Sequence, residues 1–267
     1  MTGVGKARGI LRRQLPPEQM MHWRVAPDPA LAFFVEHFWM VRWDLPDHPP
    51  QLQETLPHPN VHLVVEAGQS GIYGVHTRRY SRLLEGRGRA FGVKFRPAGF
   101  QSFLRKPLSN LANCHVAIDA VFGDAGRAIE RALLDSEDTA LVPLAEAFFQ
   151  ARRPTPDTVA ESINDLVARI ARTPSMTTVA SVLGHTMFPL RQLQRHFRHY
   201  VGVSPKWVIN RYRLHEAVER LANASAADWT RLAHDLGYFD QAHFIRDFKR
   251  LTGRTPGAFV RAEGKRR

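Results

Sequence analysis

The stretch LAHDLGYFDQAHFIRDFKRLTGRTP, residues 232–256, decides the fold of the C-terminal part of the chain. Its beginning predicts a short helix, because Leu232, Ala233 and Leu236 place apolar side chains on one face. Gly237 predicts the end of this helix, since glycine adopts the left-handed backbone conformation without a steric penalty. The stretch therefore opens as a helix followed by a tight turn.

The rest of the stretch predicts a second helix. Asp240 is a favourable N-cap residue, and Phe244 and Phe248 lie four residues apart, so they share a face that can pack on the first helix. One buried face and one free, polar face are what a helix–turn–helix unit needs to enter a major groove. The free face carries Gln241, Ala242, Arg246 and Lys249.

The same pattern occurs earlier, in VASVLGHTMFPLRQLQRHFRHYVGVSP, residues 179–205. Alignment of GVSP (202–205) with GRTP (253–256) matches Phe197 with Phe248 and predicts that Phe197, like Leu193, points inward. Two units with the same ending indicate an internal duplication, which chance produces far less readily than a single motif.

The two units differ in their turns. Gly184 lies eleven residues before Arg195, whereas Gly237 lies nine residues before Arg246. The first turn, His185–Pro189, is therefore predicted to be longer than the second.

Positive charge is concentrated in this region. The whole chain has a formal net charge of +12. From Pro174 onward it has 13 Arg and 3 Lys against 4 Asp and 3 Glu, an excess of nine positive charges. A basic domain beside a nearly balanced one is the electrostatic pattern of nucleic-acid binding. Double-stranded DNA is therefore the expected partner.

The C-terminal part resembles the tandem helix–turn–helix domain of AraC/XylS-type bacterial transcription regulators. The resemblance implies that two recognition helices of one monomer enter successive major grooves of DNA. A second copy of the chain and RNA polymerase are further candidate partners. A cytoplasmic location is expected because the sequence shows neither the apolar run of a signal peptide nor a membrane span. The matching residues are Arg213 and Leu214 within a predicted connecting helix, residues 206–222, followed by Gly237, Phe248, Lys249, Gly253, Thr255 and Pro256.

Candidate DNA contacts lie on the free faces of the recognition helices. Arginine can bond guanine O6 and N7, and glutamine can bond adenine N6 and N7. A solvated helix side chain is the alternative for each residue. The predicted base-reading set is Arg191, Gln192, Gln194 and Arg195 in the first unit and Gln241, Ala242 and Arg246 in the second. The predicted phosphate set is Arg198, Lys206, Lys249, Arg250 and Arg254, with the N-cap residue Asp240.

Residues 22–97 have the pattern of short strands. Apolar side chains alternate with polar ones in three segments, which is typical of half-buried strands. Residues 72–76 and 79–84 are weaker strand candidates. The alternating side chains are Phe33, Val35, Trp39, Val41 and Trp43, then Val61, Leu63 and Val65, and then Phe91, Val93 and Phe95.

Short strands separated by proline and glycine predict a small β-barrel or sandwich. This region resembles the cupin-like N-terminal domain found on many AraC-type regulators, in a poorly characterised branch, through VEHFWMVRWDL, ETLPHPNVHLV and GRAFGVKFRPAGF. The resemblance implies a domain that binds a small-molecule effector, mediates dimerisation, or does both. The candidate effector-pocket residues, for which core packing is the alternative, are Trp39, Trp43, His62, Phe91 and Phe95.

The predicted fold class is α+β: a cupin-like β-barrel with a helical extension, then an all-α domain of two helix–turn–helix units joined by a long helix. Helical spacing at 128–133 and 141–148 predicts helices that pack on the barrel or on a second protomer. Asp157 is the expected cap of the first helix after the linker. The predicted divisions are a flexible basic arm at 1–20, the cupin-like domain at 21–150, a linker at 151–156 and the DNA-binding domain at 157–264.

A metal site is not predicted. His58, His62 and Glu66 recur every four residues, but prolines flank His58 and the chain lacks the His-x-His pair of catalytic cupins. The single cysteine, Cys114, excludes a disulfide framework and is interpreted as a small buried hydrophobe. No cofactor is expected.

An enzyme is not predicted either. The chain has no G-x-S-x-G, phosphate loop or H-E-x-x-H motif, and no apolar run approaches the roughly 18 residues that a membrane span needs. Two alternatives stay open. One is a metal-dependent cupin enzyme with an appended DNA-binding domain, and the other is a ligand-free DNA-binding protein whose N-terminal domain only dimerises.

Overall fold

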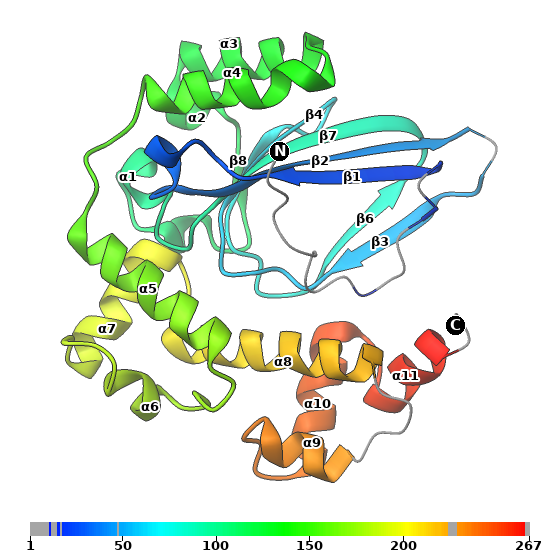
Figure 1. Cartoon of the computed structure of the whole chain (residues 1–267), viewed down its shortest axis with the longest axis vertical. Coiled ribbons are helices and arrows are strands. Elements are labelled where there is room, and N and C mark those ends of the chain that lie inside the picture. Colours follow the sequence, from blue (N-terminus) through cyan, green and yellow to red (C-terminus); the bar gives the residue numbers. More distant parts are fainter. Residues whose placement is uncertain (1–10, 12–14, 17, 47, 224–228, 265–267) are drawn as a thin grey trace.

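The computed structural model describes residues 11, 15–16, 18–46, 48–223 and 229–264. A mainly β domain lies in the upper part of Figure 1 and a helical domain in the lower part. The predicted arm at 1–20 falls mostly outside the described residues. In the part of the chain that is described, no helix has the length and apolar character needed to cross a membrane.

The β domain contains a six-stranded antiparallel sheet and a two-stranded ribbon. The sheet has the order β1 (Met20–Val25), β2 (Val35–Leu45), β7 (Gly86–Phe95), β4 (His62–Glu66), β5 (Gly71–Tyr73) and β8 (His115–Val116). The ribbon pairs β3 (Gln51–Thr55) with β6 (Tyr80–Leu84). The predicted mainly β, cupin-like architecture is present, but among the described strands the sheet and ribbon stay separate, so the barrel is not closed.

One face of the six-stranded sheet packs on helices. The alternating residues of β4 and β7 and the segment before β4 are buried there as predicted: Val61, Leu63, Val65, Phe91, Val93 and Phe95. Two longer helices, α3 (Asp124–Asp135) and α4 (Asp138–Gln150), cover this face (Figure 1). The shorter elements that complete the layer are η1 (Pro29–Leu31), α1 (Gln101–Leu104), η2 (Leu108–Leu111) and α2 (Asp119–Phe122).

The opposite face of the sheet is covered too, which corrects the prediction of half-buried strands. In β2 the buried residues Phe38 and Met40 face the helices. Trp43, which points to the opposite face of the sheet, is also buried. Residues of β2 and of the ribbon line one pocket between them. The sheet is therefore the middle layer of three, with the ribbon below it in Figure 1.

The helical domain contains the two predicted units. Asp157 caps its first helix, because the carboxylate accepts the N–H of Val159 at 2.8 Å. The π-helical element η3 extends the recognition helix α7. The elements are α5 (Thr158–Arg172), α6 (Val179–Leu183), α7 (Leu190–His196), η3 (Phe197–Val201), the long connecting helix α8 (Pro205–Asn223), α9 (Trp229–Asp235), α10 (Gln241–Thr252) and α11 (Pro256–Gly264).

The turns and ends of the two units carry the marks of duplication. Both recognition helices end at a glycine with positive φ, 91° at Gly202 and 77° at Gly253, a conformation that favours glycine. Residues 184–189 separate α6 from α7, and residues 236–240 separate α9 from α10. The first turn is therefore longer by one residue, in the direction that the sequence predicts.

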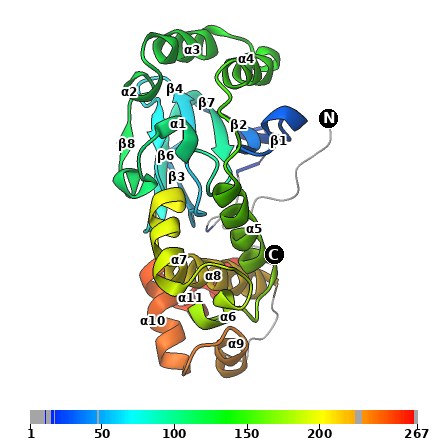
Figure 2. The ribbon, with the colours of Figure 1, turned by 90° about the vertical axis from the view of Figure 1, so that its left-hand side faces the viewer.

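Each unit packs into a separate hydrophobic cluster that includes side chains of the β domain. The cluster of the first unit, built on α5, α6, α7 and the start of α8, contains Val75 and Ala98. The cluster of the second unit, built on α9, α10 and the end of α8, contains Leu11 and Leu56. Figure 2 shows the helical domain stacked directly below the β domain. The two domains therefore share buried surface at two places.

Candidate DNA-binding face and ligand pocket

The first recognition helix presents one polar face. Arg191, Gln194 and Arg195 are exposed on α7; Gln194 and Arg195 lie three and four residues after Arg191, so each shares a face with it. Arg198, one turn further, continues it, whereas Gln192 is half-buried. The structure buries Leu193 and Phe197 fully on the other side, as predicted.

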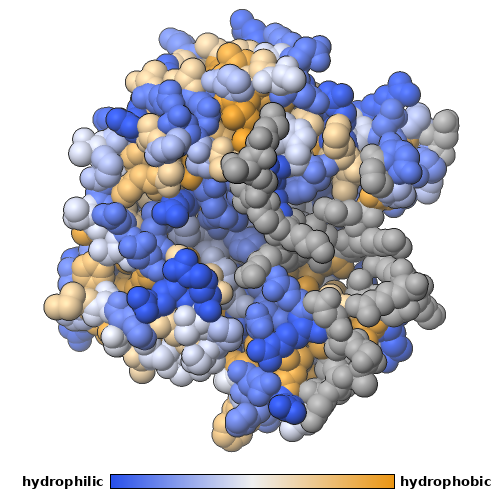
Figure 3. Space-filling view, in the orientation of Figure 1, coloured by the Kyte–Doolittle hydropathy of each residue, from blue (hydrophilic) through white to orange (hydrophobic). Residues whose placement is uncertain are grey.

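The second recognition helix presents a comparable face. Ala242, Arg246 and Lys249 are exposed along α10, with Phe244 and Phe248 buried opposite. Gln241 is only half-buried, and its side-chain oxygen accepts the hydroxyl of Thr230 at 3.4 Å, so its side chain is already engaged. Hydrophilic side chains cover much of the molecular face drawn in Figure 3, over both domains, with apolar patches between them.

The residues assigned to phosphate contacts divide into three groups. Lys206, Arg198 and Lys249 are exposed. Arg250 is exposed but lies 2.9 Å from Asp247 in an ion pair, and Arg254 is half-buried. Asp240 is the N-cap of α10 and accepts the N–H of His243 at 2.6 Å. Asp240 therefore begins the helix, and because a carboxylate repels phosphate, we do not carry it into the proposed phosphate set.

Three further exposed side chains in the two units were not among the predicted site residues. His243 lies on the free face of α10 and matches Gln192 in the alignment of the units. Met187 and Phe239 occupy the two turns and are 96% and 95% exposed. Met187 and Phe239 can be recognised in the sequence because each is an apolar residue inside a short turn. Neither belongs to the helical spacing of apolar residues on either side.

Arg213 fixes the turn of the second unit. Its Nε donates to the carbonyl of Leu236 at the end of α9, and its guanidinium lies 4.0 Å from the ring centroid of Tyr238. Burial raises the pKa of Tyr238 to about 12. Arg213, which is half-buried, thus acts inside the unit and leaves the free face to other cations.

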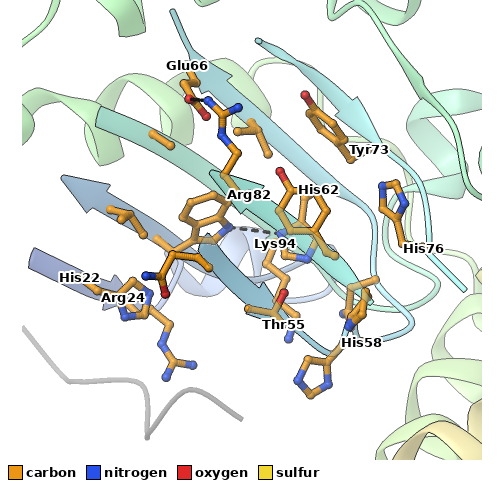
Figure 4. A pocket seen from close by; sticks show the side chains of 18 of the residues that line it. His22, Arg24, Thr55, His58, His62, Glu66, Tyr73, His76, Arg82 and Lys94 are labelled. Carbon is orange, nitrogen blue, oxygen red and sulfur yellow. Dashed lines mark hydrogen bonds and ion pairs between the residues drawn. The ribbon is translucent and has the colours of Figure 1, made fainter. Parts of the chain in front are cut away.

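The β domain holds a pocket between the six-stranded sheet and the ribbon (Figure 4), with a volume of about 350 Å³. A volume near this value suits a small molecule. The ribbon contributes alternate residues, as a strand pair with one inward face must. These are Gln53 and Thr55 from β3 and Tyr80, Arg82 and Leu84 from β6.

Two tryptophans on the sheet lie flat against glycines of β7. Trp39 is paired with Gly92 and Trp43 with Gly88. A Cβ atom on Gly92 would lie 2.1 Å from the indole Cε2 of Trp39, and one on Gly88 would lie 2.1 Å from Cζ2 of Trp43. Both glycines are therefore required by the tryptophans that line the pocket.

A polar row crosses the same face of the sheet. The strand register aligns His37, Lys94, His62 and Tyr73 on four neighbouring strands. Lys94 Nζ lies 2.8 Å from Glu36, and the indole N–H of Trp39 donates to Nδ1 of His62 at 3.2 Å, the dashed line in Figure 4. Because Nδ1 accepts, the neutral His62 ring carries its hydrogen on Nε2.

Three histidines of the pocket, His22, His37 and His62, have lowered pKa values that favour the neutral ring. Burial lowers the pKa of His62 to about 3, and repulsion from Lys94 acts in the same direction. Burial, then repulsion from Arg24, lowers the pKa of His22 to about 4, and burial lowers that of His37. Burial alone would raise the pKa of Glu36, but the attraction and hydrogen bonds of Lys94 and His37 together outweigh burial, lower this pKa and keep the carboxyl ionised.

The structure corrects part of the predicted effector pocket. Trp39, Trp43 and His62 line the pocket, whereas Phe91 and Phe95 are buried on the helix-covered face. The register pairs Phe91 with Met40 and Gly92 with Trp39. Neighbouring positions point to opposite faces, so Phe91 and Trp39 lie on different sides of the sheet.

The predicted histidine series does not form a metal site. His58 stacks on His215 of α8 with ring centroids 4.2 Å apart, and Glu66 pairs with Arg82. Among the described residues no group of three or more His, Cys, Asp or Glu side chains is placed to hold a metal ion. Cys114 is exposed, so its interpretation as a buried hydrophobe was wrong.

Comparisons with known proteins match the two domains separately. A domain family of unknown function, DUF6597, matches residues 23–117, and a helix–turn–helix domain family matches residues 185–262. The transcriptional activators RhaS of two Pectobacterium species, P. carotovorum and P. atrosepticum, are each 35% identical over 68 residues, 26% of this chain and 24% of the relative. The match thus spans about a quarter of the length of these relatives.

Solved structures of ToxT from Vibrio cholerae align along most of the chain. The O395 structure is 12% identical, with 91% of this chain and 96% of ToxT covered and a TM-score of 0.36. The structure of wild-type ToxT bound to unsaturated fatty acid is 12% identical, with 91% of this chain and 93% of ToxT covered and a TM-score of 0.34.

The duplicated units and the domain match define the class: a helix–turn–helix protein with two such units in one chain. The helix–turn–helix match and the similarity to RhaS support a regulator of the AraC/XylS type, with an N-terminal domain that matches DUF6597.

Proposed function

We propose that the protein is a sequence-specific, DNA-binding transcription regulator. The observation that carries this proposal is the pair of exposed basic and amide faces on α7 and α10. In this proposal Arg191, Gln192, Gln194, Arg195, Gln241, Ala242 and Arg246 read bases, and Arg198, Lys206, Lys249, Arg250 and Arg254 contact phosphates. The helix–turn–helix match to a transcriptional activator supports this class over an enzyme.

In this proposal each monomer reads two successive major grooves, one with each recognition helix. The test is selection of bound fragments from the source genome with the full chain, followed by footprinting. We expect protection of about two helical turns per protomer on one face of the duplex. Protection confined to a single groove would contradict the two-helix mode, and no enrichment over random DNA at moderate salt, with and without a pocket ligand, would contradict sequence-specific binding.

We also propose that a small molecule in the β-domain pocket controls DNA binding. The two walls of the pocket contact different units of the helical domain. On the ribbon side, Leu56 lines the pocket and is buried in the cluster of the second unit, and His58 stacks on α8. On the sheet side, the segment after β7 places Ala98 in the cluster of the first unit, where its N–H donates to Asn164 at 2.9 Å.

These contacts couple the width of the pocket to the relative position of the recognition helices. A ligand that separates ribbon and sheet would move Leu56 relative to Ala98, and with them the two units. Differential affinity for the two arrangements is what a regulatory ligand requires. Dimerisation and contact with RNA polymerase remain predictions, and sedimentation of the full chain with and without operator DNA tests the first. Location in the cytoplasm follows as part of the same proposal.

A further inference from the structure

The pocket has a flat apolar side. The indoles of Trp39 and Trp43 lie against the backbone of β7, each with its edge atoms over a glycine. Val41 and Ala90, paired across β2 and β7, lie between the two tryptophans on the same face. Aromatic rings prefer offset-stacked or edge-to-face contacts with other rings. This side therefore favours a flat, aromatic group over a flexible chain or a sugar.

The other side of the pocket has more positive than negative charge. Arg24, Arg82 and Lys94 line it, and Glu66 is the acidic residue among its described lining residues. Glu66 is already paired with Arg82. Lys94 and Arg24 share one carboxylate, that of Glu36 just outside the lining. One positive charge is left over, next to the neutral donors His62 and His37.

The carboxylate of Glu36 already has partners at this end. The amide nitrogen of Asn60 donates to Glu36 at 3.0 Å and to the carbonyl of Phe95 at 2.6 Å. The hydroxyl of Tyr73 donates to Gln69 at 2.7 Å. A cationic ligand would meet repulsion here from the excess positive charge. An anionic group would gain the ammonium of Lys94 and the Nε2–H of His62.

We propose that the pocket binds a planar aromatic small molecule with one anionic group, such as an aromatic carboxylate. The ring lies against Trp39 and Trp43, and the carboxylate lies between Lys94 and His62. The claim that this ligand controls DNA binding rests on the proposed function. The claim that the ligand binds in the pocket is independent of it.

The test is calorimetric titration of the full chain, without DNA, with four probes. They are 2-naphthoate, the neutral 2-naphthalenemethanol, the cationic 2-naphthylmethylamine and the flexible anion decanoate. We expect 2-naphthoate to bind about tenfold or more tightly than each of the other three, because one charge-assisted bond is worth about that much. Equal affinity for the alcohol would overturn the anionic part, and tighter binding of decanoate would overturn the planar part. No binding of 2-naphthoate overturns the proposal as a whole.

Lys94→Gln is the matching variant, because glutamine can still donate to Glu36. We expect it to lose about tenfold in affinity for 2-naphthoate while its affinity for 2-naphthalenemethanol stays unchanged. A variant that merely misfolds would lose both, so an equal loss would count against the assignment of Lys94. Trp39→Leu should weaken both probes alike, since it removes the aromatic surface and not the charge.

Footprinting with and without 2-naphthoate separates the two levels of the proposal. Binding of 2-naphthoate with an unchanged footprint would uphold the ligand class and contradict ligand control. A footprint that is independent of every probe, together with no probe binding, would contradict both while leaving DNA recognition intact.

Discussion

Arg195 and Arg246 occupy matching positions in the two recognition helices, and both are exposed. We predict that Arg195→Ala and Arg246→Ala each cost about 1–3 kcal/mol of binding free energy and relax specificity at one base pair. Lys249→Ala is the control from the same helix, and it should weaken all sequences alike. Competition assays on a library of single-base operator variants measure this. Uniform weakening by all three variants would remove the distinction between base and phosphate contacts.

Gly92 is the residue on which the position of Trp39 depends. We predict that Gly92→Ala lowers the unfolding free energy by about 1–3 kcal/mol, because the new Cβ overlaps the indole. Gly184→Ala is the matched control, since a Cβ there would meet only the carbonyl oxygen of Ser181 at 3.7 Å. Urea denaturation of both variants gives the comparison. Equal stability of the two would mean that Trp39 moves away without cost.

His62 makes stability dependent on pH. Its pKa is about 3 in the folded protein against an ordinary value of 6.5, so below pH 6.5 the unfolded state binds more protons than the folded state. Stability therefore falls as the pH falls from 6.5 toward 3. We predict a shallower fall of the melting temperature for His62→Gln, whose side-chain oxygen can still accept from Trp39. Parallel curves for variant and wild type would contradict a neutral His62.

At the scale of elements, the cap of α5 also joins this helix to the first recognition helix. Asp157 accepts the N–H of Val159 and the hydroxyl of Tyr200, the latter at 2.6 Å. We predict that Asp157→Ala costs about 0.5–2 kcal/mol of stability. Tyr200→Phe, which leaves the cap intact, should cost less. Thermal unfolding of both variants measures the difference, and an equal loss would assign the whole effect to the tyrosine bond.

Local patterns predicted most of the individual elements. The alternation in β4 and β7, the cap at Asp157 and the glycines that end both recognition helices depend on neighbouring residues, so the sequence contains the information. The π-helical end of the first recognition helix, Phe197–Val201, has no such signal, since its composition suits an α-helix equally.

The pocket was harder to predict because it depends on pairing between distant strands. The β3 segment, QLQET, is polar and has no alternation, so nothing in it indicates a strand that covers a sheet. Trp39 and Phe91 both alternate correctly in their own strands. The register of β2 and β7 pairs Met40 with Phe91, so Trp39 and Phe91 point to opposite faces of the sheet. A register slip of one residue would place them on the same face.

At the scale of the whole molecule, Arg79 joins the ribbon to the second unit. Its Nη1 lies 3.0 Å from Glu54 and donates to the carbonyl of Thr252 at the end of α10, 3.3 Å away. We predict that Arg79→Ala speeds hydrogen exchange at the end of α10 and leaves α7 unchanged. Arg78→Ala, its exposed neighbour of equal charge, is the control. Faster exchange in both helices would mean that the domain responds as one body.

The two hydrophobic clusters of the helical domain have a consequence for cooperativity. Each is completed by β-domain side chains, Val75 and Ala98 in one and Leu56 in the other. Excision of the segment after residue 156 would open a void in both clusters, and voids in a core are costly. The linker therefore separates the two matched domains in the sequence, but the two domains do not fold independently of each other. The fragment after residue 156 is expected to melt well below the intact chain.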